Sequence, residues 1–185
     1  EDQTVHANTI LEAFGNARTT RNDNASRFGK FLSLGVCRDT GTLLSARVDT
    51  YLLEKVRLVM PPRHERNYHI FYELLHGTSS EEKERWSLRM CDERSFAMTA
   101  ISEVTTRRDG VDDAGEYLRT CEAMDACGLG GAEREDVMSV VALTLHVGNL
   151  TFEELTELEC RIDGSNPHIP PVLALLGVKA ESLNE

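Results

Sequence analysis

The sequence has little positive charge and no long apolar run. Its 185 residues carry 20 Lys and Arg against 31 Asp and Glu, a formal charge of −11. Nucleic acids and anionic membranes attract an excess of basic side chains, and a membrane-spanning helix needs about 20 predominantly apolar residues. The start Glu1-Asp2-Gln3 is not typical of a signal peptide. We therefore expect neither a nucleic-acid partner nor direct membrane insertion.

The sequence also lacks cysteine pairs of the C-x-x-C type. Disulfide frameworks use an even number of cysteines, and structural zinc sites use closely spaced pairs. Neither pattern fits the five cysteines of this chain, which are Cys37, Cys91, Cys121, Cys127 and Cys160. The pattern predicts buried free thiols in the cytoplasm. Because the chain starts at Glu1 and not at Met, we expect a fragment of a longer protein.

The spacing of apolar residues predicts one mainly helical domain with a β-hairpin. Apolar residues at helical spacing predict a helix that ends at residue 14, and alternating apolar residues predict a hairpin over residues 31–50. Most of residues 51–185 have helical spacing, and the stretch from Glu133 is apolar enough to predict the central buried helix. Further expectations are a capping box at Ser79 and Glu82, an acidic box at Asp113 and Glu116, a loop at Pro170-Pro171, and a solvated loop or helix face at Glu153, Glu154, Glu157 and Glu159.

Residues 15–30 differ in composition from the rest of the chain. They carry the basic residues Arg18, Arg21, Arg27 and Lys30 against the single acid Asp23. A loop rich in Asn, Ser and Gly can turn N–H groups and amides toward phosphate, a serine can ligate Mg²⁺, and an arginine supplies a fixed charge. Composition alone favours a solvated basic surface loop, so the order of the residues has to decide.

The order of these residues resembles the switch I region of a myosin motor domain. Residues 11–31 are LEAFGNARTTRNDNASRFGKF, and the family pattern is LEAFGNAKTxRNxNSSRFGKF. Further agreement lies in YLLEK at 51–55, ERNYHIFY at 65–72 and LHVGNLTF at 145–152. The resemblance implies an α/β fold of the P-loop NTPase, myosin motor-like type. This chain would supply a helix before switch I (1–14), switch I (15–30), a hairpin of the central sheet (31–50) and upper actin-cleft helices (51–185).

The resemblance also implies roles for individual residues. Asn22 matches the asparagine that contacts the nucleotide phosphates, Ser26 the serine that ligates Mg²⁺, and Arg27 the arginine that pairs with a switch II glutamate. Asn24 and Ala25 would contribute backbone positioning. The implied cofactors are ATP and Mg²⁺. The implied partners are the actin filament and, through a lever outside this segment, light chains or calmodulin, in a cytoplasmic and cytoskeletal setting.

One residue departs from the family pattern at a sensitive place. Ala25 stands where the family has the first of two serines, so a hydroxyl that would position the lytic water is missing. Two hypotheses follow: an actin-based motor that hydrolyses ATP, or a myosin-like actin tether with slow or absent turnover. The sequence also contains neither G-x-x-x-x-G-K-[ST] nor D-x-x-G-F-E. We expect these motifs outside the chain, and therefore no ATP hydrolysis by the fragment alone.

A zinc site is a further possibility that the sequence raises. His69, Glu73 and His76 fall on one face of a predicted helix. Because a fourth ligand and a metalloprotease pattern are missing, we favour packing roles for these three side chains.

Overall fold

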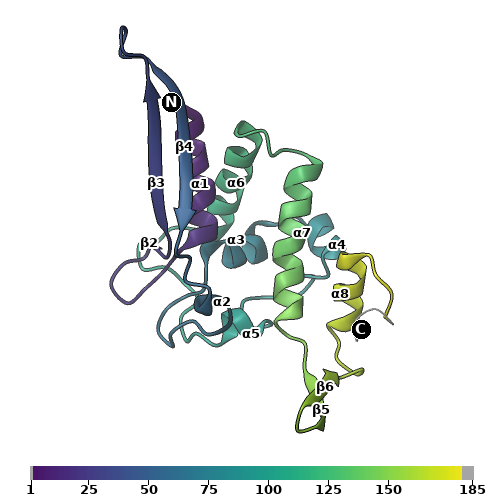
Figure 1. The fold of residues 1–185 in the computed structure, drawn as a ribbon. Helices are drawn as coiled ribbons and strands as arrows, with labels where there is room; N and C mark the ends of the chain where they lie inside the picture. The colour runs from purple at the N-terminus through teal and green to yellow at the C-terminus, as the bar shows by residue number, and fades with distance from the viewer. Residues whose placement is uncertain (1, 181–185) are drawn as a thin grey trace.

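A computed structural model describes residues 2–180 as a helical body with three separate two-stranded antiparallel sheets (Figure 1). The helices are α1 (Asp2–Gly15), α2 (Val56–Val59), α3 (His69–Gly77), α4 (Ser80–Arg85), α5 (Ala97–Ala100), α6 (Asp113–Ala126), α7 (Ala132–Val147) and α8 (Ile169–Leu176). The strands are β1 (Asn16–Ala17), β2 (Ala25–Ser26), β3 (Gly29–Val36), β4 (Leu43–Tyr51), β5 (Phe152–Thr156) and β6 (Glu159–Ile162). None of the described helices combines the length and apolar character that a bilayer crossing needs.

Helix α3 lies at the centre of the core. Every residue from His69 to Leu75 is buried, and α3 contacts α1, α6 and α7. At its end the chain approaches α6 so closely that a Cβ on Gly77 would lie 2.2 Å from the Cβ of Tyr117. Glycine is therefore required where α3 meets α6. This corrects the prediction from sequence that the helix from Glu133 is the central one.

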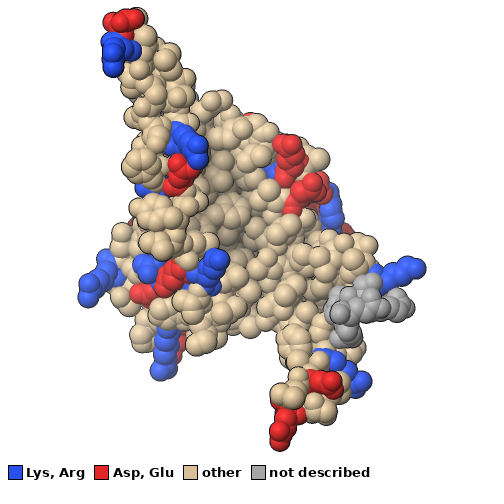
Figure 2. Space-filling view, viewed as in Figure 1, with Lys and Arg blue, Asp and Glu red and all other residues tan. Residues whose placement is uncertain are grey.

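Helix α7 buries only one of its faces. Met138 and Leu145 are buried, whereas Val140 is 58% exposed. The outer apolar residues line an open groove of about 620 Å³ between α7, α3 and the end of α1. Figure 2 shows few charged side chains on the molecular face between the β3–β4 hairpin and α7. One side of the wide apolar stripe of α7 thus packs on the core, and the other side lines the open groove.

The hairpin predicted over residues 31–50 is confirmed as β3 and β4. The two strands pair in register from Gly29 opposite Tyr51 to Gly35 opposite Ser45, and the hairpin extends beside α1 (Figure 1). Both of its faces expose apolar side chains, among them Phe31 at 63% and Leu44 at 70%. A two-stranded sheet of this kind has little stability of its own.

Several local predictions are confirmed and others are wrong. The capping box of Ser79 and Glu82 is present at the start of α4. The cap of α6 is Asp112, which accepts a hydrogen bond from the Gly115 N–H, and not Asp113. Asp113 pairs instead with the buried guanidinium of Arg66 at 2.8 Å. That pairing removes Asp113 from the cap position.

Three further predictions need correction, two of them in the C-terminal part. The acidic cluster at 153–159 belongs to the β5–β6 hairpin, which Glu153 and Arg161 bridge at 2.8 Å. Pro170-Pro171 lies in the first turn of α8. Backbone N–H groups have no partner within the helix there, so the N–H that proline lacks costs no helical hydrogen bond. The cysteines are unpaired, but four are half-buried and Cys160 is exposed, so the prediction of buried thiols is wrong.

Two histidines join α7 to the segment before α8. His146 Nε2 lies 2.9 Å from the Trp86 carbonyl oxygen and therefore donates to it. His146 Nδ1 then accepts from His168 Nδ1 at 2.9 Å, and His168 Nε2 accepts from the Asn149 amide at 3.0 Å. Every ring nitrogen has a partner only when both rings are neutral. Burial lowers the pKa of both histidines.

We predict that the His146–His168 contact makes the chain less stable in acid. Because the folded-state pKa values lie below the ordinary value, the unfolded state binds more protons as the pH falls through 6.5, and stability is lost. Between pH 7.5 and 5.5 the loss is at most about 1.4 kcal/mol for each histidine that stays neutral. Urea unfolding at both pH values should show a smaller loss for His168→Asn than for the native chain. His64→Asn, which changes a histidine with a side chain 64% exposed, should not lessen the loss, and equal losses in all three proteins would contradict the prediction.

Candidate functional site

The segment from Gly15 to Phe28 folds as a compact loop closed at its base. Strands β1 and β2 pair antiparallel, with Asn16 opposite Ser26 and Ala17 opposite Ala25. The Arg27 N–H donates to the Gly15 carbonyl at 2.8 Å, and the Thr19 N–H donates to the Asn22 carbonyl at 2.8 Å. Backbone hydrogen bonds therefore define the path of the loop, which composition alone had suggested to be a solvated connection.

The side chain of Asn22 presents a donor to solvent. Its amide oxygen accepts a hydrogen bond from the Asn24 N–H at 2.9 Å. Because an N–H must meet an oxygen, this bond fixes the orientation of the amide group and leaves the Asn22 Nδ2 as the outer atom. Asn22 is exposed, so this donor is accessible to an anion. The same bond uses the Asn24 N–H within the loop, although the sequence predicted a positioning role for that backbone.

The hydroxyl of Ser26 is arranged as a cation ligand would need. It donates to the Phe28 carbonyl oxygen at 2.8 Å, and Ser26 is exposed. The proton is thus directed to Phe28, and oxygen lone pairs remain for another partner. A hard cation such as Mg²⁺ prefers oxygen ligands.

Arg27 pairs with a glutamate inside this chain. Its Nε donates to Glu54 Oε2 at 2.6 Å, and the same oxygen accepts from Arg57 Nε at 2.7 Å. Burial alone would raise the pKa of Glu54, but the hydrogen bonds from the two arginines outweigh burial and the pKa is lowered. The switch II partner predicted for Arg27 would lie outside the chain, and Glu54 is a partner that sequence reasoning missed.

Arg57 connects Thr20, in the middle of the loop, to Arg27, at its end, through its glutamate partners. Its side chain is 1% exposed, and its Nη2 donates to Glu65 Oε2 at 2.7 Å. Glu65 in turn accepts from the Thr20 N–H at 3.2 Å. The network therefore runs from Thr20 through Glu65, Arg57 and Glu54 to Arg27. Both glutamates lie in the segments YLLEK and ERNYHIFY, which the sequence had marked without assigning a role.

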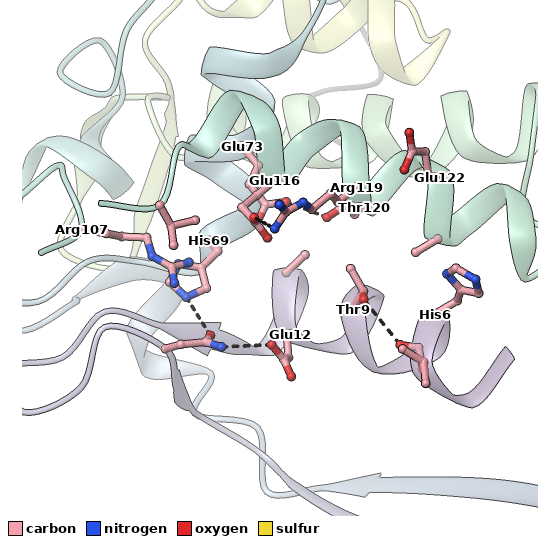
Figure 3. A pocket seen from close by; sticks show the side chains of 15 residues that line it. His6, Thr9, Glu12, His69, Glu73, Arg107, Glu116, Arg119, Thr120 and Glu122 are labelled. Atoms are coloured by element: carbon pink, nitrogen blue, oxygen red, sulfur yellow. Dashed lines mark hydrogen bonds and ion pairs between the residues drawn. The ribbon is translucent and has the colours of Figure 1, made fainter. Parts of the chain in front are cut away.

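Asn24 fastens the inner side of the loop to helices α1 and α3. Its Nδ2 donates to Glu12 Oε2 at 3.0 Å, and its Oδ1 accepts from Asn16 at 3.0 Å and lies 3.2 Å from His69 Nε2. In Figure 3, dashed hydrogen bonds from His69 and Glu12 converge on one side chain that lies between these two residues. Asn24 thus faces the protein interior, opposite in direction to the exposed Asn22.

A polar cavity of about 430 Å³ lies beside this contact, between α1, α3 and α6 (Figure 3). Glu73 lines it, is 3% exposed, and accepts from Thr120 Oγ1 at 2.9 Å. Burial raises the pKa of Glu73 to about 7. Burial, with the nearby charges of Arg107 and Arg66, lowers the pKa of His69 to about 3. His76, the third residue of the zinc pattern, pairs with Glu93 at 3.3 Å.

Comparison with known proteins identifies the family. The whole chain, residues 1–185, matches the model of the myosin head (motor domain). The chain belongs to the myosin head family. It is 38% identical to Myosin-52 of Schizosaccharomyces pombe, 39% identical to Myosin-2 of Saccharomyces cerevisiae and 38% identical to unconventional myosin-IXa of Mus musculus.

These matches cover 99%, 97% and 97% of this chain but only 12%, 11% and 8% of the three myosins. The chain therefore spans about a tenth of the length of these relatives. The family resemblance seen in the sequence is confirmed, whereas the roles of single residues in this myosin head segment stay predictions.

We predict that Arg57 stabilises the loop more than any exposed arginine does. Arg57→Met leaves Glu54 and Glu65 without their buried partner, and breaking a buried ion pair costs about 3–5 kcal/mol. Hydrogen exchange should accelerate at the Thr20 amide, which depends on Glu65, and urea unfolding should show the lower stability. Arg89→Met is the matched control, since Arg89 has a side chain 75% exposed. An equal effect of both substitutions would show that the network contributes nothing.

We also predict that Glu73→Gln stabilises the chain at alkaline pH. The raised pKa means that the folded state holds a proton which the unfolded state loses above about pH 4.5, so stability falls as the pH rises toward 7. Glutamine keeps an acceptor for Thr120 and removes this penalty, which is at most about 3 kcal/mol. Thermal unfolding should show a gain at pH 8 that disappears near pH 5. A gain of the same size at both pH values would contradict the assignment of a neutral, buried Glu73.

Proposed function

We propose that this chain is the nucleotide-sensing part of an actin-based motor that binds and hydrolyses ATP with Mg²⁺. The observation that carries the proposal is the loop Asn16–Phe28, which presents an amide donor and a serine oxygen to solvent. Phosphate oxygens accept hydrogen bonds and Mg²⁺ binds oxygen, so the two groups match the two parts of a Mg²⁺–nucleotide complex. Membership of the myosin head family supports the same assignment.

In this proposal each loop residue has a separate task. Asn22 Nδ2 would donate to a phosphate oxygen, and Ser26 Oγ would contribute a lone pair to Mg²⁺ while its own O–H stays hydrogen-bonded to the Phe28 carbonyl oxygen. Arg27 uses Nε for Glu54 and offers its Nη fork to a second carboxylate, the switch II glutamate. Bound Mg²⁺ would neutralise charge that develops on the phosphates.

The proposed domain assignment follows the myosin head. Residues 15–30 act as switch I, and residues 31–50 join the central sheet of a P-loop NTPase fold, which the exposed apolar residues on both faces of the hairpin support. Residues 51–185 form helices of the upper actin cleft. Light chains or calmodulin would bind a lever outside this segment, and the assembled motor would act on the cytoplasmic actin cytoskeleton.

Ala25 supports a second candidate function, a myosin-like tether that binds actin with slow or absent ATP turnover. Ala25 lies between Asn24 and Ser26 on the candidate nucleotide loop and carries no hydroxyl that could position or relay a proton from water. The substitution leaves the Ser26 hydroxyl and the Arg27–Glu54 pair in place. We favour the motor because these groups, which serve metal binding and loop closure, are retained.

The test is single-turnover ATP hydrolysis by the complete motor domain that contains this chain, with and without actin. We expect the native protein to hydrolyse ATP within about threefold of the Ala25→Ser variant, because water can replace a hydroxyl in a proton relay at little cost. Turnover by the serine variant alone, with nucleotide and actin bound by both proteins, would assign the tether. Failure of both proteins to bind Mg²⁺–ATP would overturn the motor, and failure of both to bind actin would overturn both candidates.

A further inference from the structure

Residues 19–23, the outer arm of the candidate switch I loop, are hydrogen-bonded to a segment almost ninety residues further along the chain. The Arg108 backbone N–H donates to Asp23 Oδ1 at 3.0 Å, and its Nε lies 3.1 Å from Asp23 Oδ2. Its two terminal nitrogens donate to the carbonyl oxygens of Thr20 at 2.9 Å and Thr19 at 3.0 Å. Arg108 thus contacts three loop residues, Thr19, Thr20 and Asp23.

The contact is reciprocal, because the loop also donates to the distant segment. Arg18 Nη1 donates to the Thr106 carbonyl at 2.8 Å, and Arg18 Nε lies 3.3 Å from Asp23 Oδ1. Asp23 therefore lies between two guanidinium groups. Burial would raise the pKa of Asp23, but the hydrogen bonds from Arg108 outweigh it and the pKa is lowered. Asp23 stays ionised, and its charge balances two arginines that repel each other.

The geometry points to Arg108 as a positioning residue for the candidate nucleotide loop. We propose that residues 105–110 form a clamp that holds Thr19–Asp23 from outside, while Glu65 and Arg57 hold Thr20 from the other side. Asn22, whose side chain is the proposed hydrogen-bond donor to phosphate, lies between these fixed points. The part of the proposal that concerns nucleotide rests on the proposed function, whereas the clamp itself rests only on the contacts of Arg108.

The chemistry of the clamp sets its response to salt and to substitution. The Arg108 side chain is 46% exposed, so dissolved ions screen its attraction to Asp23. A guanidinium can bond one carboxylate and two carbonyl oxygens together because its donors diverge in one plane, and an ammonium group cannot reach all three. Arg108→Lys should therefore restore only part of the function that Arg108→Ala removes.

The first experiment is hydrogen exchange on the 185-residue chain, which requires no nucleotide. In Arg108→Ala, the amides of residues 19–24 should exchange about 3- to 10-fold faster, the factor expected for the loss of about one hydrogen bond of ordinary strength. Arg108→Lys should give an intermediate rate, and Arg89→Ala, at an arginine with a side chain 75% exposed, should leave the rate unchanged. In the native chain the rate should rise with salt. Unchanged exchange in Arg108→Ala would overturn the clamp.

The second experiment measures release of a fluorescent ATP analogue from the complete motor domain that contains this chain. The clamp predicts that Arg108→Ala releases Mg²⁺–nucleotide about 3- to 10-fold faster and raises KM, whereas kcat at saturation stays within about twofold of the native value, because Arg108 holds the loop and touches no phosphate. Faster exchange with unchanged release would restrict Arg108 to a structural role and overturn positioning. If the native domain binds no analogue, the proposed function fails, and the exchange result still decides whether the clamp exists.

Discussion

Arg57 carries a full positive charge in a place almost closed to water, and much of the site follows from neutralising that charge. A buried guanidinium is stable only with well-placed acceptors, and Glu54, Glu65 and the Arg66 carbonyl oxygen supply them at 2.7, 2.7 and 2.9 Å. The acceptors come from both sides of α2. The short helix α2 is thereby tied to the start of α3, and the loop that contacts the same glutamates acquires a fixed position.

The loop is consequently held from three directions. Glu54 contacts Arg27 at its base, Glu12 and His69 hold Asn24 from α1 and α3, and Glu65 and Arg108 contact its outer arm at Thr20. The inward-facing amide of Asn24 has both its nitrogen and its oxygen hydrogen-bonded within the protein. The side chains of Asn22 and Ser26 are exposed and use only part of their hydrogen-bonding capacity internally: the Asn22 amide oxygen accepts from the Asn24 N–H, and the Ser26 hydroxyl donates to the Phe28 carbonyl oxygen. In the proposed function, the Asn22 Nδ2 and the Ser26 Oγ lone pairs stay available to a ligand, and binding would require little rearrangement of the loop.

The sequence allowed much of this site to be predicted, but not the contacts that hold it. Helical and alternating patterns located α1, α3, α7 and the β3–β4 hairpin, because burial of a stripe leaves a visible period. The residue order of 11–31 identified the loop itself. The roles of Glu54, Arg57 and Arg108 were not predicted. The sequence alone does not reveal whether a charged residue is buried, or that its partner lies 27 or 85 positions away. The wrong assignment of Asp113 as the cap of α6 has the same cause. Two adjacent aspartates fit a helix cap equally well in sequence, and only the ion pair of Asp113 with Arg66 distinguishes them.

The contacts that hold the loop come from residues of this chain, and none of them involves the side chain of Ala25. A serine at this position would add a hydroxyl without altering the Arg57 network, the Asn24 contacts or the Arg108 clamp, because none of them uses the side chain of residue 25. Loss of that hydroxyl therefore changes the chemistry available to a bound water and leaves the position of Asn22 and Ser26 unaltered. Under the proposed function, a myosin head with this loop would bind Mg²⁺–nucleotide with either residue at position 25, so a motor and a tether would differ in the hydrolysis step and not in affinity.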